Sequence, residues 1–180
     1  MQLLNTHILG ASAVVAALLL AGCGGGASPN PNNAGPFTVD ARIESTDFFD
    51  RNDDRYYDIF VTEVARDGRA EVAMSSFDVD SQIFIYRRDS NGDYGNFIAE
   101  DDDSGDGPDA IVRFDVRRGE VYRVVATSSR AQEFGDYRIF FSRELGRPAI
   151  VLPRENGRTA PGLDLPALKA KGEVEKRAGK

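Results

Sequence analysis

Apolar and polar residues alternate with a period of two through much of residues 37–143. Eight short segments there are rich in Val, Ile, Phe and Tyr, and none of ten residues or more repeats its apolar positions every 3.6 residues. This pattern predicts β-strands rather than helices. The expected strands are FTVDARI (37–43), YDIFVTEVA (57–65), AEVAMSS (70–76), QIFIYRR (82–88), NFIAED (96–101), AIVRFDV (110–116), VYRVVATS (121–128) and YRIFFS (137–142).

Turn-forming residues separate these segments. Gly, Asn, Asp and Pro cluster in RDGR (66–69), DSNGDYG (89–95), SGDGPD (104–109) and RRGE (117–120), where tight turns need positive φ or local side-chain bonds. About eight strands at this spacing predict an all-β fold, an antiparallel two-sheet β-sandwich of jelly-roll-like type. QIFIY (82–86) and RIFF (138–141) are almost continuously apolar, so both are expected to be central strands covered on both faces.

The N-terminal region has the features of an export signal. Residues 8–20 form an uncharged apolar run of 13, which has the length of a signal-peptide core and is short for a membrane span. LAGC (20–23) follows and resembles the lipobox of bacterial lipoproteins, although the segment before the run carries no Lys or Arg. We therefore expect cleavage before Cys23, lipidation of that cysteine and anchoring of the protein on a membrane.

Composition divides the chain into four parts. We expect a lipoprotein signal peptide at 1–22, a flexible Gly/Pro/Asn tether at 23–36, the β-sandwich at 37–143, and a disordered Pro/Gly/Lys-rich tail at 144–180. Cys23 is the only cysteine, so no intramolecular disulfide stabilises the sandwich. Gly24 follows the cysteine in place of the Asp associated with inner-membrane retention, so cell-envelope localisation at the outer membrane is favoured over the inner membrane.

Charge excludes one class of partner. Residues 37–143 hold 24 Asp and Glu against 14 Arg, a net charge of −10, whereas residues 144–180 have a net charge of +3. A domain this acidic has no general basic face, so nucleic acid is not an expected partner. The expected partners are the membrane, through Cys23, and an extracellular polymer or an envelope protein.

Three acidic clusters have the spacing of cation ligands. Carboxylates at alternate positions in a turn can direct several oxygens inward, and calcium takes six to eight oxygen ligands. Calcium is the predicted cofactor, with Asp102, Asp103 and Asp109 as the first candidates. The full candidate set is Asp101, Asp102, Asp103, Asp106 and Asp109 in one loop, Asp78 and Asp80 in a second, and Asp50, Asn52, Asp54 and Asp58 in a third.

Two features of the sequence limit this metal hypothesis. DDSGDG (102–107) reproduces the first half of an EF-hand, but the closing position falls at Arg113, which excludes that motif. The same aspartates also suit a purely structural role, in which they cap turns and accept hydrogen bonds from loop amides. The sequence leaves both roles open.

Four blocks in order resemble one known family. SSFDVDSQIFIYRRDSNGDY, AEDDDSGDGPDAIVRF, RRGEVYRVVATS and EFGDYRIFFS resemble the successive blocks of the bacterial pre-peptidase C-terminal domain. The resemblance covers residues 37–143 and departs from the family pattern at Ser81–Gln82. It implies a β-sandwich of the kind attached to exported proteins, strengthens the calcium hypothesis by analogy, and suggests an accessory module that recognises a polysaccharide or a fibrous protein.

The sequence lacks the residues of the common catalytic arrangements. The only histidine, His7, lies in the expected leader, so the mature chain has no Ser-His-Asp, Cys-His or HExxH arrangement. We therefore expect a protein that is not an enzyme. A hydrolase that uses two carboxylates stays as an alternative, which requires two acids facing each other in a pocket.

Aromatic residues also lie beside the loops, and they serve either the core or a binding surface. They include Phe48, Phe49, Tyr56, Tyr57, Tyr94 and Phe97.

Overall fold

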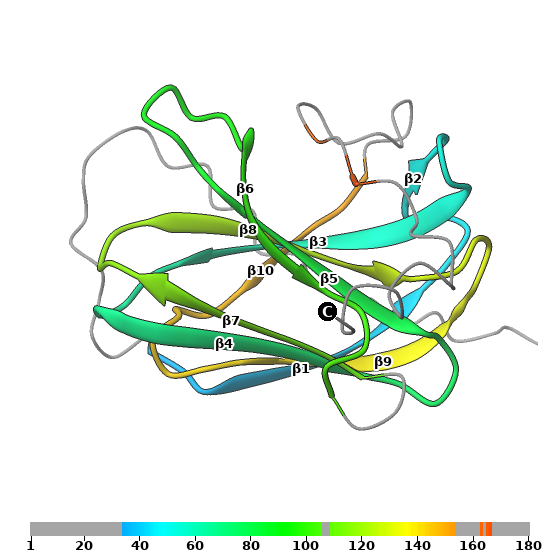
Figure 1. Cartoon of the computed structure of the whole chain (residues 1–180), viewed down its shortest axis with the longest axis horizontal. Helices are drawn as coiled ribbons and strands as arrows, with labels where there is room; N and C mark the ends of the chain where they lie inside the picture. Colours follow the sequence, from blue (N-terminus) through cyan, green and yellow to red (C-terminus); the bar gives the residue numbers. More distant parts are fainter. Residues whose placement is uncertain (1–33, 106–108, 154–162, 164, 167–180) are drawn as a thin grey trace, which may run out of the picture.

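Two antiparallel sheets face each other in this protein. The computed structural model describes residues 34–105, 109–153, 163, 165 and 166, and within these residues it contains ten strands and no helix (Figure 1). The predicted β-sandwich is therefore confirmed. The strands are β1 (Phe37–Ile43), β2 (Phe48–Asp50), β3 (Arg55–Glu63), β4 (Gly68–Ser75), β5 (Ser81–Arg87), β6 (Asn96–Asp101), β7 (Ala110–Val116), β8 (Val121–Ser128), β9 (Gly135–Phe141) and β10 (Ala149–Val151).

The four-stranded sheet, in the order β1-β9-β4-β7, follows the period-two pattern closely. Its inward residues are apolar and are buried in β7 and β9 and mostly half-buried in the edge strand β1, whereas its outward residues alternate with them and are largely charged. The outward side chains pair across strands, as in Arg138 with Asp40 at 2.7 Å and Arg113 with Glu71 at 2.7 Å. RIFF in β9 is thus interior in the strand order but exposes one face at Arg138, so the prediction that both its faces are covered was wrong.

The six-stranded sheet has the order β10-β3-β8-β5-β6, and the short strand β2 also pairs with β3. Here the prediction for QIFIY holds, because β5 is buried on both faces from Ser81 to Tyr86. One face of this sheet closes the sandwich and the other faces outward. Both faces are apolar, so the two sheets of the protein differ sharply on their outer sides.

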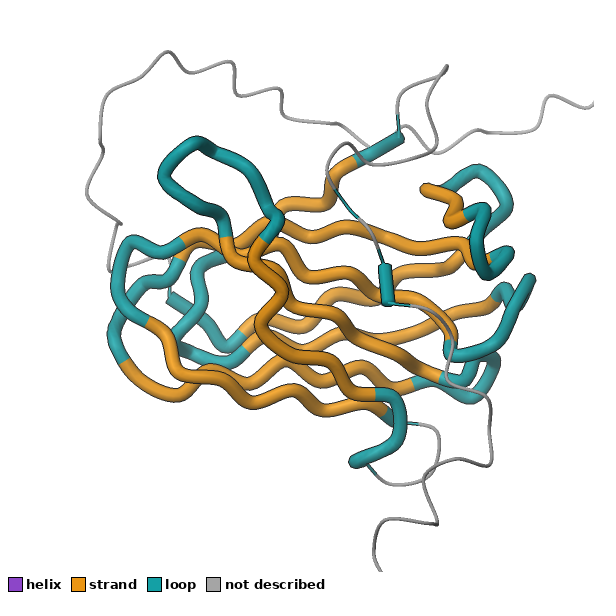
Figure 2. The backbone as a smooth tube through the Cα atoms, turned by 45° about the horizontal axis from the view of Figure 1, so that its top comes forward, coloured by secondary structure: helices purple, strands orange, loops and turns teal. Residues whose placement is uncertain are grey.

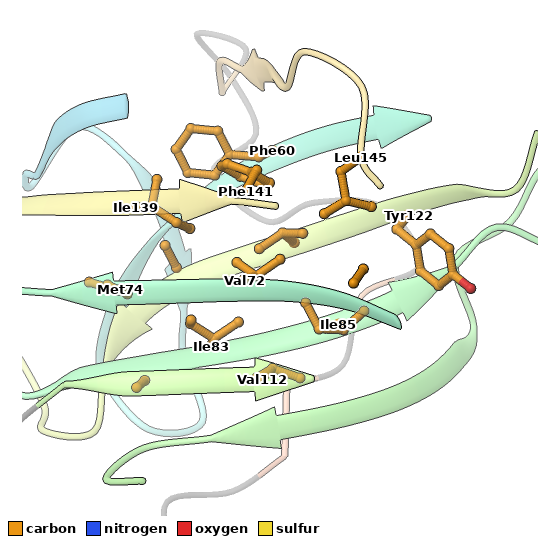
Figure 3. Close-up of a cluster of buried hydrophobic side chains, with 14 of the residues drawn as sticks. Phe60, Val72, Met74, Ile83, Ile85, Val112, Tyr122, Ile139, Phe141 and Leu145 are labelled. Carbon is orange, nitrogen blue, oxygen red and sulfur yellow. The ribbon is translucent and has the colours of Figure 1, made fainter. Parts of the chain in front are cut away.

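The inter-sheet core is made of inward side chains from both sheets. Phe60 and Phe141 meet across it with their ring centroids 5.7 Å apart in an edge-on arrangement, and Met74, Ile83 and Ile139 lie fully buried beside them (Figure 3). Full burial of each such side chain contributes about 1.5–3 kcal/mol to stability. Because no disulfide is available, this packing supplies most of the stability of the sandwich.

A second apolar cluster lies on the outer face of the six-stranded sheet. We call it the outer cluster; its sheet residues are Phe48, Tyr57, Ile59, Phe84, Tyr86 and Val125. Leu163 and Leu165 pack against it from the C-terminal part of the chain, which places residues predicted to be disordered in the folded structure. We call Leu163, Leu165 and Pro166 the strap. β10 pairs with β3 as well, so ordered structure extends past the predicted boundary at Arg143. The remainder of the tail lies outside the described residues.

The register of the strands gives the sandwich two distinct ends. At one end Ala34 forms a β-bridge with Gly146, and Gly35 donates its amide to Leu145 at 2.9 Å. The turns at 64–67 and 117–120 lie at this tether end, where Gly119 has a φ of +85° that suits glycine. The loops at 51–54, 76–80 and 129–134, with the described residues 102–105 and 109, lie at the opposite end, which we call the loop end (Figure 2).

Candidate functional site

The loop 101–109 is held by its own carboxylates. Oδ2 of Asp101 accepts hydrogen bonds from the amides of Ile111, at 2.7 Å, and Ser104, at 3.1 Å. Oδ1 of Asp109 accepts from the amide of Ser76 at 3.3 Å, and its carbonyl accepts from Gly105 at 2.9 Å. These two aspartates thus fix the turn by satisfying loop amides. Asp103 is exposed, Asp102 is half-buried, and Asp106 lies outside the described residues.

The neighbouring loop 76–80 is fixed in the same way. Ser76 Oγ accepts from the amides of Asp78 and Val79 and donates to the carbonyl of Asp136 at 2.6 Å. Oδ2 of Asp78 accepts from the amide of Asp136 at 3.0 Å. The contact is so close that a Cβ at Gly135 would overlap the Cβ of Asp78, which explains the glycine at the start of β9. Asp78 therefore ties the start of β9 to the β4–β5 loop.

Asp80 has a cationic partner rather than a metal-like surrounding. Its Oδ2 lies 3.1 Å from Nε of Arg130, and its amide donates to Oε2 of Glu133 at 2.8 Å. The same Glu133 oxygen accepts from the hydroxyl of Ser128 at 2.5 Å. Glu133 thus joins the loops before β5 and after β8. Its role was missed because the sequence shows no link between the two loops.

The candidate metal ligands that the structure describes do not gather around one point. Among the described residues, no three Asp, Glu, His or Cys side chains are grouped as a metal ion requires. Asp78, Asp101 and Asp109 instead accept hydrogen bonds from backbone amides, and Asp80 meets an arginine. Calcium binding therefore stays a prediction, and the described geometry explains the carboxylates of Asp78, Asp101 and Asp109 without an ion.

Asp50 of the third cluster, together with its neighbour Asp53, lies beside a buried arginine. The Arg55 side chain is 0% exposed and lies at the start of β3 on the outer face. Its Nη1 donates to Gln82 at 2.8 Å, and its Nη2 meets Asp53 at 3.1 Å and Asp50 at 3.4 Å. Oδ1 of Asp50 also accepts the amide of Asn52 at 3.0 Å. The positive φ of Asp54, 53°, turns the chain into β3.

Asp58 is separated from the rest of that cluster. It lies on the inner face of β3, opposite Arg55, and is 6% exposed. Its Oδ2 accepts a hydrogen bond from the hydroxyl of Tyr137 in β9 at 2.6 Å, which joins the two sheets inside the sandwich. Burial raises the pKa of Asp58 to about 7, and the bond from Tyr137 opposes that rise. Alternation along β3 already places Asp58 on the face of Phe60, so a sequence signal for its burial existed.

An open depression with a volume of about 970 Å³ lies beside the outer face of the four-stranded sheet. Asp40, Asp109 and Asp136 line it together with Arg42 and Arg138. Asp40 is paired with Arg138, and Asp136 with Arg42 at 2.8 Å. Carboxylate-based hydrolysis needs one acid that donates a proton and one that attacks or activates water. Asp40 and Asp136 are each held by a guanidinium group, and Oδ1 of Asp109 accepts the amide of Ser76, so these three acids do not show such a couple.

Aromatic side chains distinguish the outer face of the six-stranded sheet. Phe48 stacks on Tyr57 with centroids 5.5 Å apart, and Tyr86 meets Phe97 edge-on at 5.6 Å. The guanidinium of Arg123 lies 4.1 Å from the ring centroid of Tyr94. The four-stranded sheet instead presents Arg, Asp and Glu pairs. Of the two outer faces, the six-stranded one has the composition of a binding surface.

Some predicted features lie outside the described residues. These are the expected signal peptide, Cys23 with its lipidation, and most of the tether. In the part of the chain that is described, no helix is long and apolar enough to cross a bilayer. The membrane anchor therefore stays a prediction from the sequence.

The fold places the chain among antiparallel β-sandwich proteins. No family model and no curated protein matches its sequence. Among solved structures, it is similar to the pre-peptidase C-terminal domain of a collagenase from Bacillus anthracis, with 13% sequence identity and a TM-score of 0.42. That similarity covers 59% of this chain and 89% of the collagenase domain. A likeness of this strength carries no argument about function, so the family resemblance stays a prediction.

Proposed function

We propose that the protein is a non-catalytic module of the bacterial cell envelope that binds its partner through the outer face of the six-stranded sheet. The observation that supports this proposal is the outer cluster. A sheet face that only met water would show polar residues at alternate positions, as the four-stranded sheet does. The six-stranded sheet instead has aromatic and aliphatic side chains there, with Arg55 and Arg123 among them. Leu163 and Leu165 of the same chain cover this face only in part, because Phe97 is still 46% exposed.

The proposal includes an anchor and a location. Lipid chains on Cys23 hold the chain on a membrane, with the outer membrane favoured over the inner one. The LAGC segment and the position of the only cysteine support this part of the proposal. The sandwich then faces the space in which envelope proteins and extracellular polymers are available as partners.

A photo-crosslinking experiment tests the binding face. Phe97 is 46% exposed on the six-stranded side, and Phe140 is half-buried on the four-stranded side. A photoreactive phenylalanine at position 97 of the full chain should give adducts with envelope components, whereas the same residue at position 140 should not. A Cys23→Ser variant should leave the membrane fraction. Equal adduct formation from both positions would contradict the proposed face.

A second candidate function is recognition of an extracellular polysaccharide or protein polymer, as in an accessory module of a secreted hydrolase. The pairs Tyr86–Phe97 and Tyr94–Arg123 favour it, because aromatic rings beside polar groups suit sugars and extended chains. Binding of the chain to insoluble polysaccharides, with and without a Tyr94→Ala substitution, distinguishes this candidate from a protein partner.

Calcium binding by the loop 101–109 is proposed as a property of the same module, and unfolding experiments test it. Extracellular calcium sites bind at about 10⁻⁴ to 10⁻³ M, so 10 mM calcium should raise the free energy of unfolding by about 1.4–2.7 kcal/mol. The measurement is thermal unfolding of the chain from residue 24 onward, in calcium, in magnesium and in EDTA.

The matched variant for that experiment is Asp103→Ala with Asp109→Ala. Asp109 also supports the amide of Ser76, so the variant is compared with itself across the three solutions rather than with the wild type. A calcium-specific rise that the variant loses supports the site. An unchanged midpoint in the wild type assigns these carboxylates to the turn alone.

A further inference from the structure

The strap lies on the outer cluster in the manner of a bound peptide. Leu163 and Leu165 are two residues apart, and both are more than nine-tenths buried against the same face of the sheet. Side chains at i and i+2 share one side of an extended chain, so an extended peptide can present two leucines at this spacing to one face. In Figure 1 the two short orange-red segments of the strap lie beside β2 and β3.

The surface beneath the strap is built to hold a backbone. Nη2 of Arg55 donates to the carbonyl oxygen of Pro166 at 2.8 Å. Gln82 and Asp53 orient the guanidinium, and its carbon lies 5.5 Å from the ring centroid of Phe84. A donor fixed in this way binds a main-chain carbonyl whatever side chain follows. The outer cluster thus offers apolar contacts to two leucines, and Arg55 offers one hydrogen bond that fixes the direction of the bound chain.

We propose that the outer cluster is a binding groove for an extended peptide segment of a partner protein, with leucines two residues apart, and that the strap is its built-in competitor. This inference rests on the proposed function and names the chemistry of the partner. A polysaccharide would meet mostly apolar side chains here, whereas the strap shows that a leucine-bearing peptide fits. The strap belongs to the same chain, so it occupies the groove at high effective concentration.

Competition sets the expected size of the effect. A free peptide meets an open groove only in the fraction of molecules whose strap has left, and its apparent affinity falls by that fraction. The strap contributes two leucines and one hydrogen bond from its described residues, which is a small contact. Removing it should therefore increase the apparent affinity of an added peptide by about ten- to a hundredfold.

The experiment uses the chain from residue 24 onward and a fluorescent peptide with the sequence of residues 160–169, APGLDLPALK. The variant Leu163→Asp with Leu165→Asp should keep the sandwich and bind the peptide by fluorescence anisotropy about tenfold more tightly than the wild type, or better. The same peptide with both leucines replaced by serine should not bind. Adding Val125→Arg to the strap variant, which fills the groove, should abolish binding. If the double variant fails to fold, Leu165→Ala provides a milder opening, with the same expected direction.

The outcomes separate this inference from the proposed function. A folded strap variant that ignores the peptide but gives envelope adducts from position 97 overturns the peptide inference and leaves the binding face in place. A folded strap variant that neither binds the peptide nor gives adducts from position 97 overturns both the peptide inference and the proposed binding face. The two leucines would then only complete the hydrophobic core. A wild-type chain that forms dimers by exchanging straps would make a second copy the occupant, which contradicts a separate partner. Retained affinity after Val125→Arg would place the peptide elsewhere.

Discussion

Replacing Arg55 with methionine should lower the free energy of unfolding by about 3–5 kcal/mol, the largest effect we expect from a single substitution in this chain. Asp50 and Asp53 keep only 9% and 17% of their side-chain surface exposed, so both would lose their cation where water compensates poorly. Gln82 and the carbonyl of Pro166 would also lose a donor. Urea unfolding at pH 7 measures the loss.

Two variants identify the cause of that loss. Arg113→Met removes a guanidinium of the exposed ladder, paired with Glu71, and should cost less than about 1 kcal/mol. Arg55→Met combined with Asp50→Asn and Asp53→Asn should recover part of the stability, because the neutral amides need no cation. A loss for Arg55→Met as small as that for Arg113→Met would show that the two aspartates reach water and that the arginine is dispensable.

Asp58 should make the sandwich less stable as the pH rises from 4 to 8. Below about pH 4 its carboxyl group is protonated in both states, and its contribution is fully present. Between pH 4 and 7 the unfolded chain releases the proton while the folded chain, with a pKa of about 7, retains it, so stability is lost. Each unit of pKa shift corresponds to about 1.4 kcal/mol, so the total loss is several kcal/mol.

The variant Asp58→Asn isolates this effect from the other titrating groups. Its amide stays neutral and accepts the hydrogen bond from Tyr137, so its stability relative to the wild type should increase steadily between pH 4 and 8. Tyr137→Phe removes the bond that lowers the pKa of Asp58, and it should extend the wild-type decline to higher pH. Parallel pH profiles for Asp58→Asn and the wild type would show that the Asp58 carboxyl is hydrated in the folded state.

The local pattern of apolar and polar residues was sufficient to predict the strands that are long enough to show alternation. Each of the eight predicted segments corresponds to one strand from β1 to β9. β2 and β10 were missed because each has three residues, too few to show a period, and both exist through pairing with β3. The covered outer face of β5 was predicted from its composition, but its cover was not, since the strap lies some 80 residues away in the chain.

The candidate site was less predictable because charge spacing does not show which partner each oxygen takes. Asp101 and Asp109 have the spacing of cation ligands, yet loop amides take one oxygen of each. Arg55 is the next residue after Asp53 and Asp54, and the sequence alone did not indicate that it is buried among them. Spacing shows how far apart the aspartates lie along the chain, whereas the groups that bond to their oxygens come from three or four different loops.

With the proposed lipid anchor at Cys23, the bridge between Ala34 and Gly146 would also limit how far the sandwich can move from the bilayer. Eleven residue steps separate Cys23 from Ala34, which span at most about 40 Å when fully extended. A lipid anchor at Cys23 would keep the tether end within that distance of the bilayer, and the seven residues of β1 place the acidic loop end about 23 Å farther along the sandwich. This length exceeds the Debye length of about 8 Å at physiological salt, so an anionic lipid surface repels the loop end least when it points outward.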